Sequence, residues 1–221
     1  YSTDTKLLIP KVSGFNIYFG TLHNHTNFSD GNGTPEEAFA YAKNVAKMDF
    51  LGISDHDPSP DKYARTIKVA KENNLDGQFV AFYGYEWSGA SHILIVNPDS
   101  VVSSHQVPYN SLEEIVSWIS GHDDVVAFFN HPGYYDSLDF NGFNFDPKTD
   151  KIVGMELWNA EDDFRKYYYN DGYYRNDGNL SWYDEALQRG WTIGAAGSSD
   201  SHWADWGTSQ EFRLAILAES N

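Results

Sequence analysis

The 221-residue sequence contains no cysteine. This absence excludes disulfide bonds, thiol nucleophiles and zinc sites built on thiolates. A strong metal site in this chain therefore needs histidine, aspartate and glutamate side chains, which supply nitrogen and oxygen ligands.

Basic residues are also few. The chain has 15 Lys and Arg residues against 32 Asp and Glu residues, which gives a formal net charge of -17. A protein of this charge repels the phosphates of nucleic acids, which proteins bind through clustered Lys and Arg side chains. We therefore expect no nucleic acid partner.

Long apolar runs are missing as well, and none approaches the roughly 18 residues that a membrane-spanning helix needs. The 41% hydrophobic and 16% aromatic residues still suffice for a folded core. No repeat, linker or change of composition divides the chain, so we expect one domain over residues 1–221, either complete or part of a larger protein. The acidic, tyrosine-rich composition favours a secreted or cell-surface protein over a cytoplasmic one.

Short apolar runs alternate with helical patterns along the chain. After a first apolar run at 17–19, buried strands are predicted at 50–53, 79–83, 93–96, 125–129, 152–157, 191–196 and 212–218, and helices at 34–46, 61–73, 111–119 and 181–189. The first helix has the clearest start, with Thr34 as N-cap and Pro35 in its first turn, and we expect Val45 and Ala46 on its apolar face. This alternation predicts a mostly parallel α/β sheet or barrel.

Histidines and carboxylates gather near the ends of these strands. They occur in the segments GTLHNHTNFSDG, ISDHD, YGYEWSG, HILIV, NHPG and SSDSHW. The carboxyl ends of the strands meet at one face of an α/β barrel, so we expect these side chains to converge there. The candidate metal ligands are His23, His25, Asp30, His56, Glu86, His92, His131, Asp200 and His202.

Spacing strengthens several of these assignments. Alternate residues of a strand point to the same side, so the two histidines of HNH could hold one ion, as could the Asp and His of DSH. Glu86 lies among aromatic residues, and because a buried carboxylate needs a cation, it is a candidate bridge between two ions. Two alternatives remain open: Asp30 could belong to an ordinary Asp-Gly turn, and His92 could simply begin a strand.

Other polar residues have different expected roles. Asp55 and His131 are candidates for proton transfer, whereas His105 and His122 lie outside the pattern. The segment 164–187 is rich in Tyr and Trp and contains Arg165, Lys166 and Arg175. It either packs its rings on the barrel rim or forms a substrate-facing lid, in which Arg175 would contact an anion.

Taken in order, HxH with a following SDG, then SDH, a strand-end Glu, HP and DSH resemble the polymerase and histidinol phosphatase (PHP) superfamily of metal-dependent phosphoesterases, from about residue 19 to 202. This resemblance implies a distorted (β/α)7 barrel with two or three divalent ions, commonly zinc, manganese or iron, at its mouth. It also implies three ligand sets: His23, His25, Glu86 and Asp200; Glu86, His92 and His131; and Asp30, His56 and His202.

The expected activity is hydrolysis of a phosphoester, because clustered divalent ions lower the pKa of a bound water and make hydroxide available at neutral pH. The substrate would be a phosphodiester or phosphomonoester of a small molecule or of a sugar or lipid head group, with the diester slightly favoured. Two alternatives remain: hydrolysis of carboxylic esters or amides, and a non-catalytic barrel that binds metal or carbohydrate. A proofreading exonuclease of the same superfamily is disfavoured by the net charge.

Overall fold

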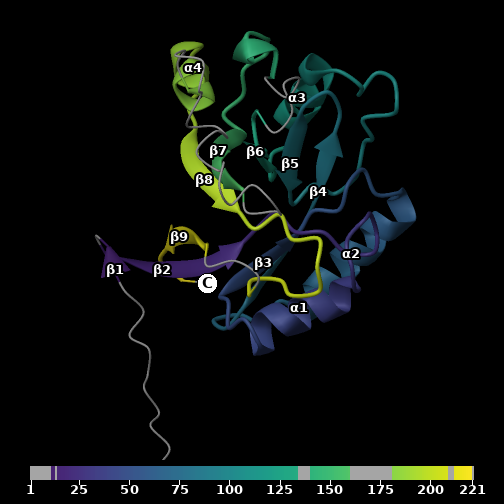
Figure 1. Cartoon of the computed structure of the whole chain (residues 1–221), viewed down its shortest axis with the longest axis vertical. Coiled ribbons are helices and arrows are strands. Elements are labelled where there is room, and N and C mark those ends of the chain that lie inside the picture. The colour runs from purple at the N-terminus through teal and green to yellow at the C-terminus, as the bar shows by residue number, and fades with distance from the viewer. Residues whose placement is uncertain (1–10, 13, 134–139, 160–180, 209–211, 221) are drawn as a thin grey trace, which may run out of the picture.

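The strands of the chain form a nearly closed barrel of eight strands, with one further short strand at its edge (Figure 1). The computed structural model describes residues 11–12, 14–133, 140–159, 181–208 and 212–220. Within these ranges the strands are β1 (Lys11–Val12), β2 (Phe15–Thr21), β3 (Phe50–Ile53), β4 (Val80–Ser88), β5 (His92–Val96), β6 (Val126–Phe129), β7 (Ile152–Asn159), β8 (Gly194–Ser198) and β9 (Leu214–Ala218). The predicted α/β barrel is confirmed.

The expectation of a mostly parallel sheet is wrong for β5, and also for β9, which pairs antiparallel with β2. Strand β5 pairs antiparallel with both β4 and β6, whereas β2–β3, β3–β4, β6–β7 and β7–β8 are parallel. Only residues 89–91 join β4 to β5, and a parallel connection needs about a dozen residues or more. Because β5 runs in reverse, its first residue, His92, lies at the end of the barrel where β4 and β6 finish.

The barrel is closed by β9, which pairs with β2, and by contacts between the segments that follow β2 and β8. Strand β9 pairs antiparallel with β2 from Asn16↔Ala218 to Gly20↔Leu214. Beyond these pairs, Asn24 and Ser201 form a parallel bridge, and the His25 N–H donates a 2.9 Å hydrogen bond to the Ser201 carbonyl. The segments that contain HNH and DSH therefore lie side by side.

Four α-helices and a 3-10 helix accompany the strands in the described ranges: α1 (Pro35–Asn44), α2 (Pro60–Asn73), α3 (Leu112–Ser120), η1 (Phe140–Phe143) and α4 (Trp182–Gln188). Figure 1 shows α1 and α2 next to each other, outside β3 and β4. None of the helices in these ranges has both the length and the apolar character needed to span a bilayer.

The predicted start of α1 is confirmed, but its predicted end is wrong. The Thr34 hydroxyl accepts from the Glu37 N–H at 3.3 Å, while the Thr34 N–H donates to the Glu37 carboxylate at 2.8 Å, as in a capping box. The helix stops at Asn44, and Val45 is its C-cap and 57% exposed. Val45 therefore does not face the core.

Two predicted strands also have different bounds. Strand β8 covers Gly194–Ser198 instead of 191–196, and Trp191 packs in the core against Phe129. Strand β4 continues to Ser88, so Glu86 lies within a strand and does not follow one. Its place in β4 orients the carboxylate by the strand's own geometry.

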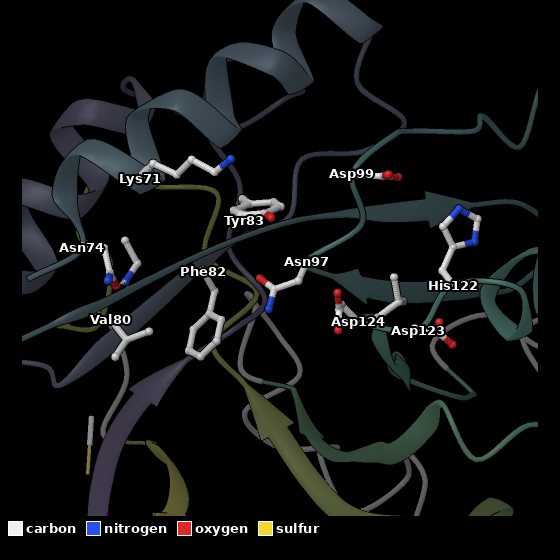
Figure 2. A pocket seen from close by; sticks show the side chains of 12 residues that line it. Lys71, Asn74, Val80, Phe82, Tyr83, Asn97, Asp99, His122, Asp123 and Asp124 are labelled. Atoms are coloured by element: carbon white, nitrogen blue, oxygen red, sulfur yellow. Dashed lines mark hydrogen bonds between the residues drawn. The ribbon is translucent and has the colours of Figure 1, made fainter. Parts of the chain in front are cut away.

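Figure 2 shows residues that line a pocket of about 470 Å³. Because the first half of β4 and the residues after β5 line it, the pocket lies at the opposite end of the barrel from His92. It is lined by the first half of β4, by Asn97 and Asp99 after β5, by residues 122–125 before β6, and by Lys71 and Asn74 of the α2 end. None of the nine predicted metal ligands lines it. The pocket is therefore separate from the predicted site.

Candidate metal centre

The structure brings all nine predicted metal ligands together. They form four overlapping groups, and within each group the ligand atoms lie within 4.8 Å of one another. The groups are His25, Asp30, His56 and His202; His23, His25 and Asp200; His23, Glu86 and His131; and His56, Glu86 and His92. Their convergence at one end of the barrel agrees with the arrangement predicted from the strand ends.

The two histidines of HNH meet the aspartate of DSH. The Nε2 atoms of His23 and His25 are 3.1 Å apart, and they lie 3.1 and 3.0 Å from Oδ1 of Asp200. Both rings are completely buried. The segments after β2 and β8, which close the barrel, thus present three donor atoms to one point.

Glu86 lies at the middle of the cluster and is completely buried. Its Oε1 is 3.1 Å from His92 Nδ1 and 3.1 Å from His131 Nε2. Its Oε2 is 2.9 Å from His56 Nδ1 and 3.3 Å from His23 Nε2. Because its two oxygens face different histidines, this carboxylate has the geometry of a bridge between two ions.

Asp30 lies at the solvent side of the cluster, with a side chain that is 61% exposed. Its Oδ1 is 3.3 Å from His202 Nε2 and 3.8 Å from His56 Nε2. The next residue, Gly31, passes so close to the backbone of His25 that a Cβ there would come within 2.7 Å of it. A side chain at this position would push the Asp30 loop away from the histidines.

The arrangement of the donor atoms suits binding of a divalent ion better than it suits hydrogen bonds among the side chains. The buried Oε2 of Glu86 and Oδ1 of Asp200 accept no hydrogen bond, although imidazole nitrogens lie near both. These oxygens and nitrogens are therefore close to one another without forming hydrogen bonds, and each group of them surrounds a position that an ion could occupy. Imidazole and carboxylate donors without thiolates suit zinc, manganese and iron.

The pKa shifts in the cluster also indicate that its carboxylates are ionised and need a positive charge nearby. Burial lowers the pKa of the His23 imidazole, but the charges of Asp200 and Glu86 outweigh burial and raise this pKa well above its usual value. Burial raises the pKa of Glu86, yet the neighbouring imidazoles, led by His23, hold it well below its usual value. The carboxylates therefore remain ionised in the interior, where a divalent ion would neutralise them.

Two of these residues have unusual backbone angles. His131 has φ = 25° and Asp200 has φ = 43°, both in the left-handed region that non-glycine residues seldom adopt. His131 also directly precedes Pro132, which restricts its backbone further. Strain of this kind persists where the surroundings hold a side chain in one direction.

Asp55 serves the loop that carries Asp30. It is buried, and its Oδ1 accepts from the Thr26 N–H at 2.7 Å, the Ser29 N–H at 3.1 Å and the Ser29 hydroxyl at 2.8 Å. Its Oδ2 accepts from the Thr26 hydroxyl at 2.7 Å. With both oxygens engaged in this way, the geometry favours a loop-holding role over the predicted role in proton transfer.

We expect Asp55→Ala to lower the free energy of unfolding of the metal-free protein by about 3 kcal/mol, because it leaves buried N–H donors without an acceptor. Asp55→Asn retains an acceptor and should keep most of the stability and the activity. Chemical denaturation of both variants measures the effect, with exposed Asp76→Ala as control. Loss of activity in a stable Asp55→Asn protein would instead support proton transfer.

The remaining predicted residues fall into two groups. His105 is exposed, and the His122 ring donates from Nδ1 to the Trp118 carbonyl at 2.7 Å, so both lie apart from the cluster as predicted. Arg165, Lys166 and Arg175 lie outside the described residues, as does the Tyr-rich segment up to residue 180.

Three buried side chains around the cluster are not among the predicted ligands: Asn130, Glu156 and Asn159. Asn130 Nδ2 donates to Glu86 Oε1 at 2.8 Å. Glu156 Oε1 lies 2.8 Å from His23 Nδ1, and Asn159 Nδ2 donates to Asp200 Oδ2 at 2.9 Å. Of the three, Glu156 is marked in the sequence as a polar residue that could do chemistry, because it is the only charged residue inside the apolar strand IVGMELWN.

No protein-family model and no curated protein matches this sequence, but its fold matches solved structures. A two-domain protein from Bacteroides vulgatus ATCC 8482, containing a predicted PHP-like metal-dependent phosphoesterase, aligns with all of this chain at a TM-score of 0.66 and 14% identity; the chain spans 64% of its length. PsfC from Pseudomonas syringae PB-5123 aligns at a TM-score of 0.54 and 17% identity, covering 85% of this chain and 77% of PsfC. The chain thus has a PHP-like barrel fold, which confirms the resemblance at the level of fold.

Proposed function

We propose, on the premise of this PHP-like barrel fold, that the protein is a metal-dependent phosphoesterase. The observation that carries the proposal is the bridging geometry of Glu86, whose two oxygens face four histidines at 2.9–3.3 Å. The Bacteroides vulgatus protein of similar fold contains a predicted PHP-like metal-dependent phosphoesterase, which agrees with this reading.

The cluster supports two or three divalent ions, with zinc, manganese and iron as the candidates. His23, His25 and Asp200 would hold one ion, and Glu86 would share it with a second at His131 and His92. Asp30, His202 and His56 would hold a third. His56 also lies 2.9 Å from Glu86, so it can contribute to the second position as well.

Ions bound at these positions would activate water and neutralise the phosphoryl oxygens. Among the chain's own residues, buried His131, whose Nε2 lies 3.1 Å from Glu86 Oε1, is the candidate for moving a proton when that nitrogen does not hold an ion. Arg175, in the Tyr-rich segment, is the proposed anion contact. Aromatic side chains on that segment suit the second organic group of a diester, which is why we favour a phosphodiesterase over a phosphatase.

The substrate we propose is a small phosphoester derived from a sugar, glycan or lipid head group. The net charge of -17 disfavours nucleic acid, and a cluster of divalent ions would attract an anionic substrate to an otherwise acidic surface. The same composition supports a secreted or cell-surface location.

The decisive experiment is a panel of three chromogenic substrates, a phosphodiester, a phosphomonoester and a carboxylic ester, given to protein loaded in turn with Zn²⁺, Mn²⁺ and Fe²⁺. We expect hydrolysis of at least one phosphoester, with the diester faster, and little hydrolysis of the carboxylic ester. Turnover of the carboxylic ester alone would replace the proposal with a different metallohydrolase activity. Metal binding without any turnover would favour a non-catalytic barrel.

A further inference from the structure

Glu156 is a buried carboxylate of β7 that contacts the predicted ligands His23 and His131 at atoms that do not face the metal cluster. Its Oε1 lies 2.8 Å from His23 Nδ1, the ring nitrogen on the far side from the cluster. Its Oε2 accepts from the His131 N–H at 3.0 Å and from Asn159 Nδ2 at 3.2 Å. Glu156 belongs to none of the groups of ligand atoms, although its side chain is only 3% exposed.

Asn159 extends this contact to a third ligand. Its Nδ2 donates to Asp200 Oδ2 at 2.9 Å as well as to Glu156, and the residue is 1% exposed. Glu156 and Asn159 both lie on β7, between β6 and β8. Through these two side chains, one strand contacts predicted ligands that follow β2, β6 and β8.

We propose that Glu156 is a positioning residue that sets the metal affinity of this centre; the inference rests on the proposed function. An imidazole that donates its Nδ1–H to a carboxylate keeps Nε2 free as an acceptor, and His23 Nε2 is the atom that faces Glu86 and Asp200. The same carboxylate holds the His131 N–H, which fixes the backbone of that residue in its left-handed conformation.

A carboxylate is required here because three donors converge on it. An ionised carboxylate has two oxygens that only accept, whereas a glutamine amide would place an NH₂ group toward one of the donors. If the NH₂ group faced His23, the ring would accept at Nδ1 and carry its proton on Nε2. If it faced His131, the backbone N–H would lose its acceptor. Either arrangement disturbs a ligand without removing it.

The test compares Zn²⁺ affinity, measured by competition with a chromogenic chelator, in the wild type and in Glu156→Gln, with Co²⁺ absorption spectra as a second readout of ligand geometry. Loss of a carboxylate that orients a metal-binding histidine lowers affinity by about 10-fold to 100-fold, and we expect a loss in this range for Glu156→Gln. Glu156→Asp, which keeps the charge, should recover part of the affinity. Exposed Glu72→Gln is the matched control and should bind as the wild type does.

Wild-type affinity and an unchanged Co²⁺ spectrum in Glu156→Gln would overturn this inference and leave the proposed function standing. A wild-type protein that binds less than one equivalent of metal would overturn both. If Glu156→Gln does not fold, Asn159→Ala provides the test, since it removes the amide that joins Glu156 to Asp200. It should bind Zn²⁺ several-fold more weakly, and wild-type affinity in that folded variant would refute the inference.

Discussion

Replacing Glu86 by glutamine should reduce the bound metal from two or three equivalents to one at most and lower phosphoester turnover by about a thousandfold or more. The carboxylate oxygens face four histidines, so its loss affects every position that shares them. A neutral amide supplies one acceptor and two hydrogens, and it leaves the imidazoles without the charge that holds them. Metal analysis of the purified variant and steady-state kinetics give the two readouts.

The matched control for Glu86→Gln is Glu113→Gln, which changes the same side chain on the exposed surface of α3. The barrel core is built from apolar side chains away from the cluster, so the Glu86 variant should fold. Asp200→Asn should show a similar loss, because Oδ1 of Asp200 lies within 3.1 Å of two histidines. Full turnover with full metal content in both variants would refute the assigned centre.

Removing the metal should lower the thermal stability and abolish the activity together. An ion that binds only the folded state stabilises it by about 2.7 kcal/mol when its concentration is 100 times its Kd. For a chain of this length, that free energy corresponds to a shift of roughly 5–11 °C in the melting temperature. Each further ion would add to the shift, since the metal-free cluster places two buried carboxylates, Glu86 and Asp200, close enough to interact.

The measurement is a thermal scan of protein treated with a chelator, repeated after Zn²⁺ or Mn²⁺ is returned. Glu86→Gln is the control that separates specific binding from effects of metal on the surface, and its melting temperature should rise far less. Equal melting temperatures for the wild type with and without metal, at saturating concentration, would contradict a preformed metal centre in the folded state.

The position of the candidate site could be predicted from sequence because its residues come at strand ends and in short motifs. The pairs in HNH and DSH need only the alternation of a strand to converge. His92 required a further step: three residues between β4 and β5 force an antiparallel pair, which brings the start of β5 to the same end as the other ligands. The direction of β5 thus follows from the length of the loop before it and not from the hydrophobic pattern.

The supporting residues were harder to predict. Asp55 stands beside His56 in sequence and was a candidate for proton transfer, but successive residues of an extended chain face opposite sides, and Asp55 turns to Thr26 and Ser29. Asn159 belongs to no motif, because its role depends on joining Glu156 of its own strand to Asp200, which follows β8. Contacts of this kind arise from tertiary packing and leave no local signature.

The closure of the barrel bears on when this centre can form during protein synthesis. Ser199 and Asn24 share a hydrogen bond although 175 residues separate them, and the histidines of HNH meet their aspartate only across this seam. A growing chain that ends before residue 199 can present the first two histidines but cannot enclose an ion with them. Contacts at such a separation also form late, because closing a long loop carries a large entropic cost. Ion capture is therefore coupled to closure of the barrel, and an intermediate in which residues 199–202 have not yet docked would hold the early histidines without their partner.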